Sequence, residues 1–231
     1  MFSTEVKDGL IRHLPQVTIL DLIAATEGAM GISFATKDQP AQTGRFHPWP
    51  GVIVTSEEGR QVAAGSGEVG MIALPGGALG YFKDPQKSAA TFRIIDGQRY
   101  TVPGDFATVE TDGSLSLLGR GSQCINTAGE KVFPEEVEEV IKTHPAVEDC
   151  LVFGVPDERF GQRVAAVVSL VEGDDPVDSE EIINTARKRL APYKLPREMV
   201  TVAVVPRTPS GKADYPEAAR LFEVAILGGD P

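Results

Sequence analysis

The stretch from Gly104 to Glu138 constrains the fold of this chain more than any other part of it. Residues 106–110 and 114–118 alternate well enough between apolar and polar side chains to predict two antiparallel strands, and Asp112-Gly113 between them favours a hairpin turn. Pro134 then opens a segment rich in glutamate and valine, and proline favours the first turn of a helix. A hairpin that leads into such a helix indicates the boundary between two domains.

Two charged residues stand at the ends of the predicted hairpin. Asp105 begins it and Arg120 ends it. Because the two ends of an antiparallel hairpin lie at the same edge, we expect both side chains to face the same side. A carboxylate at this position can accept two hydrogen bonds from a vicinal diol. For either residue taken alone, the alternative is an ordinary turn with a solvated charge.

Short segments along most of the chain resemble the adenylate-forming superfamily, which comprises acyl-CoA synthetases, luciferases and peptide-synthetase adenylation domains. They occur in the family's order, as Ala25–Gly28, Gly104-Asp105, Gly119-Arg120, Ile125 with Gly129-Glu130, Pro134–Glu138 and Pro206–Lys212. One such segment carries little weight, whereas several in the same order carry much. The residues that follow Gly119 look closest to the fatty-acid and steroid-side-chain CoA ligases of actinobacteria.

The resemblance implies a nucleotide site in the first half of the chain. It assigns Thr26 to the nucleotide phosphate, Glu27 to Mg²⁺, and Asp105 with Arg120 to the ribose hydroxyls. A hard cation favours carboxylate and phosphate oxygens together, which agrees with the assignment of Glu27. Without the resemblance, Thr26 and Glu27 would be an ordinary pair of loop residues.

The resemblance also implies a mobile second domain. Lys212, at the tip of a proline-containing loop, is the expected catalytic residue, because a mobile point cation suits the charge that develops on the phosphate during adenylation. Ser122 is the expected hinge, and Gly129 is the expected CoA-binding residue. Ala128 stands where the family has another glycine, which puts a methyl group near the expected path of the pantetheine arm.

The predicted fold class is α+β. Residues 1–121 are expected to form the end of the family's large domain, with a small β-barrel-like subdomain, and residues 122–231 a compact α/β C-terminal domain with a three-stranded sheet and helices. The apolar run 17–24 predicts a buried parallel strand that leads to Thr26. In the helix that begins at Pro134, every glutamate, including Glu138, is expected to face the solvent.

The implied function is that of an acyl-CoA synthetase, or fatty-acid–CoA ligase, of which this chain is a fragment. The complete enzyme would activate a carboxylic acid with ATP and Mg²⁺ to an acyl-AMP and then transfer the acyl group to CoA. The family's Ser/Thr/Gly-rich triphosphate loop is not found in the sequence, so a truncated, non-catalytic module is one alternative. A ligase or peptide-synthetase adenylation domain that loads a carrier protein is another. The acyl substrate is not readable from these residues.

Charge and hydropathy limit the kinds of partner and the location that the sequence predicts. Residues 1–121 carry 10 basic and 13 acidic side chains and residues 122–231 carry 12 and 20, so neither half is expected to bind nucleic acid. No apolar run is long enough for a membrane span and no leader is found, which favours the cytoplasm. The expected partners are a small carboxylic acid, ATP and CoA, together with the missing N-terminal part of the ligase or a second copy of the chain. Cys124 and Cys150 lack metal-ligand spacing and are expected to be buried or half-buried thiols.

Overall fold

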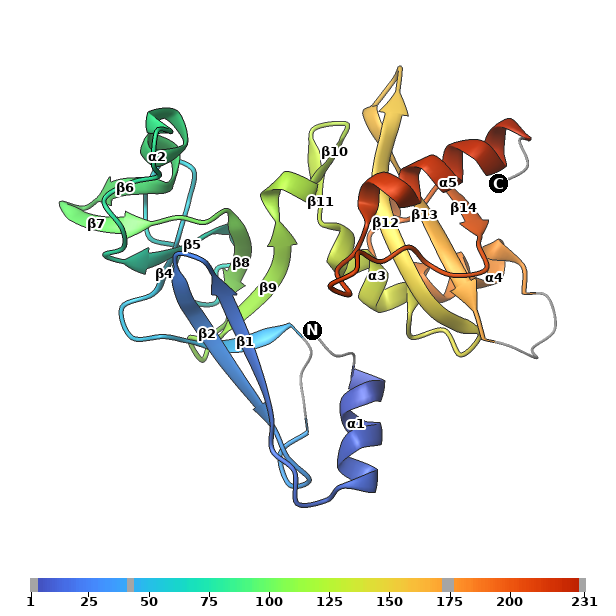
Figure 1. Ribbon diagram of the computed structural model, residues 1–231, viewed down its shortest axis with the longest axis horizontal. Helices are drawn as coiled ribbons and strands as arrows, with labels where there is room; N and C mark the ends of the chain where they lie inside the picture. The colour runs from blue at the N-terminus through green and yellow to red at the C-terminus, as the bar shows by residue number, and fades with distance from the viewer. Residues whose placement is uncertain (1–3, 41–43, 172–176, 229–231) are drawn as a thin grey trace. The chain divides into compact units, whose positions relative to one another are not determined.

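The computed structural model describes residues 4–40, 44–171 and 177–228 (Figure 1). The chain divides into two units, Met1–Gly121, called unit 1, and Ser122–Pro231, called unit 2. The identity of the two units as the end of a large domain and a mobile C-terminal domain stays a prediction. No helix in the described part of the chain has both the length and the apolar character that a membrane span requires.

The described residues of unit 1 form two helices and a nine-stranded sheet. The helices are α1 (Thr4–His13) and α2 (Pro85–Thr91). The strands are β1 (Ile19–Ala25), β2 (Gly28–Ala35), β3 (Arg45–Pro48), β4 (Ile53–Thr55), β5 (Gly70–Pro75), β6 (Phe92–Ile95), β7 (Gln98–Thr101), β8 (Asp105–Val109) and β9 (Leu115–Arg120). Their order is β1-β2-β3-β9-β8-β5-β7-β6, with β4 paired to β5.

The sheet of unit 1 is open. Strands β1 and β6 stand at the two ends of the strand order, so the described strands form no closed barrel. All pairings within unit 1 are antiparallel, and the expected hairpin is confirmed as β8 and β9. The mixed α and β content is confirmed, whereas the barrel-like subdomain is not. Short strands separated by glycines indicate an antiparallel sheet, but they carry no information about whether it closes into a barrel.

Strand β1 corrects one prediction from the sequence. The run 17–24 was expected to be a buried parallel strand, but β1 pairs antiparallel with β2 through a turn of two residues, because Ala25 faces Gly28. A connection this short can join only antiparallel strands, since parallel strands need a crossover of a dozen or more residues. Leu20 and Leu22 are about half exposed, at 48% and 54%, so the continuous apolar run does not mean burial on both faces here.

In unit 2, the residues that the structure describes form three helices, two short 3₁₀ turns and five strands. The helices are α3 (Pro134–Ile141), α4 (Ser179–Arg187) and α5 (Tyr215–Leu227), and the 3₁₀ turns are η1 (Gly121–Gln123), which begins at the last residue of unit 1, and η2 (Pro192–Lys194). The strands are β10 (Ile125–Thr127), β11 (Glu130–Val132), β12 (Val147–Asp157), β13 (Gly161–Leu170) and β14 (Glu198–Thr201). The order is β11-β10-β13-β12, and β14 pairs parallel with β13.

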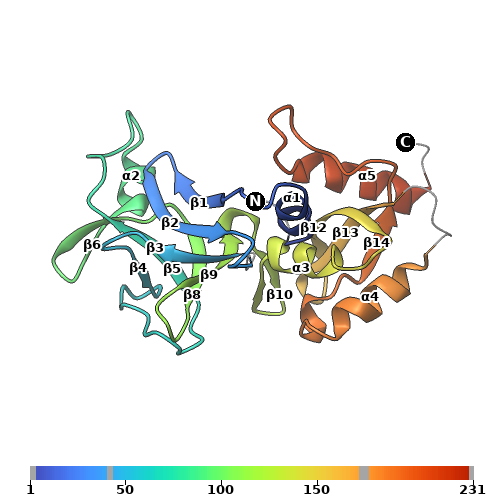
Figure 2. The ribbon, with the colours of Figure 1, turned by 90° about the horizontal axis from the view of Figure 1, so that it is seen from below.

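The sheet of unit 2 is covered on both faces, with α5 on one and α4 on the other (Figure 2). Alternate residues of β12 enter two separate clusters. Cys150 and Val152 pack in the cluster that includes α3 and α4, whereas Leu151 and Phe153 pack in the cluster that includes Phe222 of α5. Burial on both faces explains why β12 and β13 read as nearly continuous apolar runs.

The expected three-stranded sheet of unit 2 is wrong, because the sheet has five strands. The two additional strands, β10 and β11, form a hairpin that joins the sheet where Thr127 pairs with Gly161. Each has only three residues and carries polar side chains such as Asn126 and Lys131. Segments this short and polar give no strand signal in the sequence, so only their pairing with each other and with β13 reveals them.

The turn between β10 and β11 holds a strained residue. Ala128 has φ of 52° and Gly129 has φ of 87°, so both central residues adopt the left-handed conformation that a two-residue hairpin turn favours. Glycine adopts this conformation without steric cost, whereas alanine does not. The turn therefore forms despite Ala128.

Replacing Ala128 with glycine is expected to stabilise unit 2. The substitution removes the steric cost of the left-handed conformation but adds unfolded-state entropy, which leaves a gain of about 0.5–1 kcal/mol in the free energy of unfolding. Urea unfolding of the parent chain and the variant measures it. Ala191→Gly is the control, because Ala191 has φ of −63° and the same change there should destabilise. A loss of stability in Ala128→Gly would contradict the interpretation that the backbone of Ala128 is strained.

Candidate functional site

Glu27 lies in the turn between β1 and β2 and is held by two hydroxyl groups. Its carboxylate accepts one hydrogen bond from the Tyr81 hydroxyl and one, of 3.0 Å, from Thr26 Oγ1. The bond from Tyr81 is the main cause that lowers the pKa of Glu27, against a smaller effect of burial. Lys87, whose Nζ lies 4.4 Å from the centre of the Tyr81 ring, acts in the same direction. Glu27 is therefore stabilised as a carboxylate.

Asp105 and Arg120 face each other across the β8–β9 hairpin, as the sequence predicted for the two ends. Arg120 Nε donates to Asp105 Oδ1 at 3.2 Å. Asp105 is 5% exposed, whereas the Arg120 side chain is 58% exposed. Burial raises the pKa of Asp105, and the charge of Arg120 acts against it. The pair thus combines a buried carboxylate with an exposed cation.

The second oxygen of Asp105 is the unusual atom of this site. Oδ2 is buried and has no hydrogen-bond partner among the described residues. A buried polar atom without a partner costs about 1–3 kcal/mol, so it is suited to accept a hydrogen bond from a ligand hydroxyl. The charge of Glu27 also raises the pKa of Asp105, which means that the two carboxylates lie within electrostatic reach of each other.

The described residues contain no cluster of three or more His, Cys, Asp or Glu side chains that could hold a metal ion by themselves. A single carboxylate nevertheless fits Mg²⁺, which is commonly bound by one or two carboxylates together with substrate phosphates. Glu27, ionised and at a turn, offers such a carboxylate. The donor set therefore fits a cation that arrives with a nucleotide and does not fit a resident metal centre.

Lys212 lies in a loop closed by its own hydrogen bonds. The loop spans residues 206–214, between β14 and α5, and Arg207 pairs with Ala213 as an isolated bridge. Inside it, Thr208 N–H donates to the Lys212 carbonyl at 2.8 Å, and Gly211 N–H donates to the Thr208 carbonyl at 2.8 Å. Lys212 is exposed. The loop therefore presents the amine to solvent on a locally ordered backbone.

Ser122 and Gly129 occupy exposed positions at the start of unit 2. Ser122 is the first residue of unit 2 and lies in η1. At Gly129 an added Cβ would meet no atom within 4 Å. Glycine is therefore favoured there by the left-handed backbone conformation and not by a lack of space. The hinge and CoA assignments of these two residues stay predictions.

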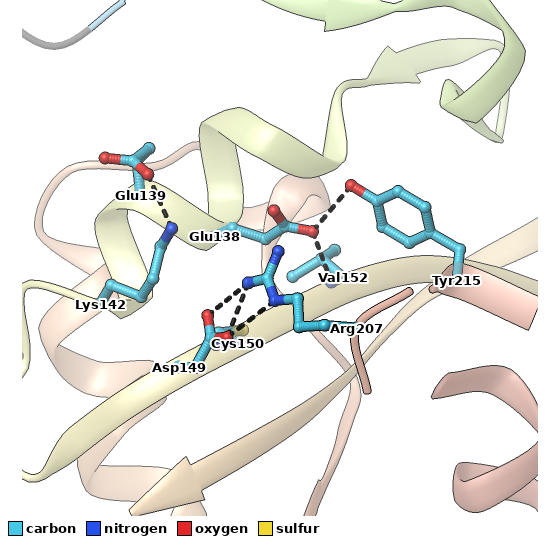
Figure 3. A network of polar contacts seen from close by, with 8 residues as sticks. All are labelled: Glu138, Glu139, Lys142, Asp149, Cys150, Val152, Arg207 and Tyr215. Carbon is cyan, nitrogen blue, oxygen red and sulfur yellow. Dashed lines mark hydrogen bonds and ion pairs between the residues drawn. The ribbon is translucent and has the colours of Figure 1, made fainter. Parts of the chain in front are cut away.

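Glu138 corrects the prediction that every glutamate of α3 faces the solvent. It is 6% exposed and accepts hydrogen bonds from Val152 N–H at 2.9 Å and from the Tyr215 hydroxyl at 3.2 Å (Figure 3). Burial raises its pKa to about 7. Pro134, Val137 and Ile141 are buried on the same helix, and Glu138 falls within their spacing of three and four residues. This spacing indicated that Glu138 is buried, but its charged side chain led to the prediction that it faces the solvent.

Tyr81 contacts the candidate site, and the sequence analysis did not identify it. Its hydroxyl meets Glu27 from a segment 54 positions along the chain, and its ring packs against Phe92 with centroids 5.3 Å apart. The sequence around Tyr81 contains no spacing that connects it to Glu27. Only the tertiary structure brings the two residues together.

Comparison with known proteins places these residues in a family context. Residues 136–212 match the model of the AMP-binding enzyme C-terminal domain. The chain is 47% identical over 218 residues to a 3-oxocholest-4-en-26-oate–CoA ligase of Rhodococcus rhodochrous, an alignment that covers 93% of this chain and 39% of the relative. It is 46% identical over 226 residues to a medium/long-chain-fatty-acid–CoA/3-oxocholest-4-en-26-oate–CoA ligase of Mycolicibacterium smegmatis, with 96% and 41% covered.

The fold is also found in solved structures. The chain superposes on an amide bond synthetase from Marinactinospora thermotolerans with a TM-score of 0.81 at 26% identity, which covers 95% of this chain and 45% of that one. The chain thus spans about two fifths of the length of the curated relatives that it matches.

Proposed function

We propose that the chain belongs to the adenylate-forming acyl-CoA ligases and that, as part of a complete ligase, it takes part in converting a carboxylic acid and ATP to an acyl-adenylate and in transferring the acyl group to CoA. The acid that we propose is a medium- or long-chain fatty acid or the side-chain acid of a steroid, because both relatives carry such names. The compartment that we propose is the cytoplasm, in agreement with two free cysteines.

The observation that carries this proposal is Oδ2 of Asp105, which is buried and finds no hydrogen-bond partner in the described part of the chain. In the proposed site, the two carboxylate oxygens of Asp105 accept hydrogen bonds from the two hydroxyls of the ribose. Arg120, which already donates to Oδ1, adds a fixed positive charge beside the nucleotide. A ribose hydroxyl would then satisfy an oxygen to which none of the described residues donates, and this gain favours nucleotide binding.

Glu27 and Thr26 face the phosphate end of the nucleotide in this proposal. Glu27, kept ionised mainly by the Tyr81 hydroxyl, would hold Mg²⁺ together with phosphate oxygens. When bound, the cation would neutralise charge that develops at the α-phosphate as the carboxylate attacks it and pyrophosphate leaves. Thr26, whose hydroxyl donates to Glu27, would contact the phosphate and orient the carboxylate.

Unit 2 supplies the groups that change between the two half-reactions. Lys212 would stabilise the charge on the acyl and phosphate oxygens during adenylation. Rotation about Ser122 would then withdraw Lys212 and bring the turn at Gly129 to the path of CoA. The exposure of all three residues is compatible with such a movement.

Substitution of Asp105 tests the proposed nucleotide site. Asp105→Ala is expected to weaken binding of AMP by about 1–3 kcal/mol, the loss that follows removal of a charged hydrogen-bond partner. Isothermal titration calorimetry on a complete ligase that carries this chain is the measurement. Such a ligase can be made by replacing the matching 218-residue segment of the Rhodococcus relative with this chain.

The control for this experiment is Asp112→Ala. Asp112 lies on the same hairpin, where its side chain is 55% exposed and pairs with Arg45. Its loss should leave AMP affinity within twofold of the parent if only Asp105 contacts the ribose. Equal affinity in the parent and in Asp105→Ala would contradict the assignment of the ribose site.

A further inference from the structure

The Lys212 loop is tied to the rest of unit 2 at its beginning by an ion pair. Arg207 Nε donates to Asp149 Oδ2 at 3.0 Å, and Nη2 donates to the two oxygens of Asp149 at 2.7 and 2.6 Å (Figure 3). A forked contact of this kind fixes the orientation of the guanidinium plane as well as its distance. Arg207 is also the residue that closes the base of the loop, by its bridge to Ala213.

The end of the loop is tied by a second carboxylate. Tyr215, the first residue of α5, follows the loop directly and donates its hydroxyl hydrogen bond to Glu138 Oε1 at 3.2 Å (Figure 3). Asp214 caps the same helix by accepting from Glu217 N–H at 3.2 Å. The chain thus leaves the loop through a helix start whose tyrosine is attached to α3.

Both carboxylates, those of Asp149 and Glu138, also accept hydrogen bonds from backbone N–H groups of one strand, β12. Among the described strands, β12 pairs only with β13, so N–H groups on its other edge need different acceptors. Cys150 N–H donates to Asp149 Oδ1 at 2.8 Å, and Val152 N–H donates to Glu138 Oε1 at 2.9 Å. Asp149 and Glu138 therefore connect the free edge of β12 to the two ends of the loop.

We propose that Asp149 and Glu138 are positioning residues that fix the direction of Lys212 by anchoring the two ends of its loop, through Arg207 and Tyr215. The hydrogen bonds inside the loop make its backbone a nearly rigid piece. The direction of that piece relative to the sheet is then set by the contacts at its base. The catalytic consequence rests on the proposed role of Lys212, whereas the anchoring does not.

Nuclear magnetic resonance of the 231-residue chain tests the anchoring without any assay of activity. In Tyr215→Phe and in Arg207→Gln, the ¹H–¹⁵N heteronuclear NOE of Gly211 and Lys212 is expected to fall, because each variant removes one anchor and leaves the loop sequence intact. The double variant should show the largest fall. The matched controls are Tyr193→Phe and Arg220→Gln, which alter an exposed tyrosine and an exposed ion pair of unit 2.

Half-reaction kinetics test the catalytic consequence in the chimaeric ligase described above. Tyr215→Phe is expected to lower kcat for acyl-adenylate formation by about tenfold, in line with the loss of one hydrogen bond to a charged group. KM for ATP and the transfer from pre-formed acyl-adenylate to CoA should stay within twofold of the parent. A structural role alone would instead lower both half-reactions together with the amount of folded protein.

The two measurements separate the outcomes. Unchanged NOE values in both single variants and in the double variant would overturn the anchoring. A more mobile loop with unchanged adenylation would overturn the positioning role. If Lys212→Ala leaves adenylation intact, the proposed function of Lys212 fails and the catalytic consequence fails with it, while the NOE values still decide whether the loop is anchored.

Discussion

Lys212→Ala is expected to lower acyl-adenylate formation by roughly a hundredfold to a thousandfold in a complete ligase, the range for loss of one preorganised group that stabilises developing charge. Transfer of the acyl group from pre-formed acyl-adenylate to CoA should stay nearly unchanged, because the amine would have left the site by then. Paired single-turnover assays, one for each half-reaction, measure the two effects. Lys37→Ala, which removes an exposed lysine of unit 1, is the control.

Substitution at the proposed hinge should give the opposite result. Ser122→Pro fixes φ near −65° at the boundary of the two units and so resists rotation after adenylation has succeeded. Transfer to CoA should fall while adenylation persists. Ser122→Ala, which keeps the backbone free, should leave both steps unchanged. Equal losses in both half-reactions for Lys212→Ala and Ser122→Pro would mean that rotation does not separate the two steps.

The stability of unit 2 is expected to fall as the pH rises from about 4.5 to about 7, because of Glu138. Its pKa is about 7 in the folded protein, raised mainly by burial, against 4.5 for the exposed group. Between these values the folded state binds the proton more tightly than the unfolded state, so each increase in pH favours unfolding. A difference of this size corresponds to about 3 kcal/mol of stability, which is fully present below pH 4.5 and lost above about pH 7.

Glu138→Gln should remove this pH dependence. The amide oxygen can still accept from Val152 N–H and from the Tyr215 hydroxyl, but the side chain no longer ionises. The variant should therefore be more stable than the parent at pH 8 and similar at pH 5. Urea unfolding at pH 5, 6, 7 and 8, followed by the amide signals of Val164 and Val167, measures the free energy. These two residues are buried in β13, so they report on unit 2.

Glu148→Gln is the control for the pH series. Glu148 lies on β12 but is exposed, so its substitution should leave the pH dependence of the parent unchanged. Parallel pH profiles for the parent and for Glu138→Gln would contradict the assignment of the titration to Glu138. Glu135 and Lys142 also act on the pKa of Glu138, in opposite directions, so the profile should be measured at constant ionic strength.

The amino-acid sequence by itself determined the local elements of this protein. The hairpin of β8 and β9, the helix that begins at Pro134 and the opposition of Asp105 and Arg120 all follow from short-range rules. Turn residues, apolar periodicity and proline at a first helical turn act over a few positions, so they can be read along the chain. The order of the short segments that resemble a known family also pointed to the acyl-CoA ligases, to which the comparisons find the chain similar.

The tertiary structure decided the environment of the polar side chains. Glu138 meets Val152 from 14 positions away and Tyr215 from 77, and Tyr81 reaches Glu27 across 54. The same holds for β10 and β11, a short hairpin that joins the sheet where Thr127 pairs with Gly161, 34 positions along the chain. Whether a carboxylate is solvated, buried or left without a partner depends on what packs against it from distant parts of the chain. That is why the sequence placed Asp105 at the site but could not show that its second oxygen is buried and without a partner among the described residues.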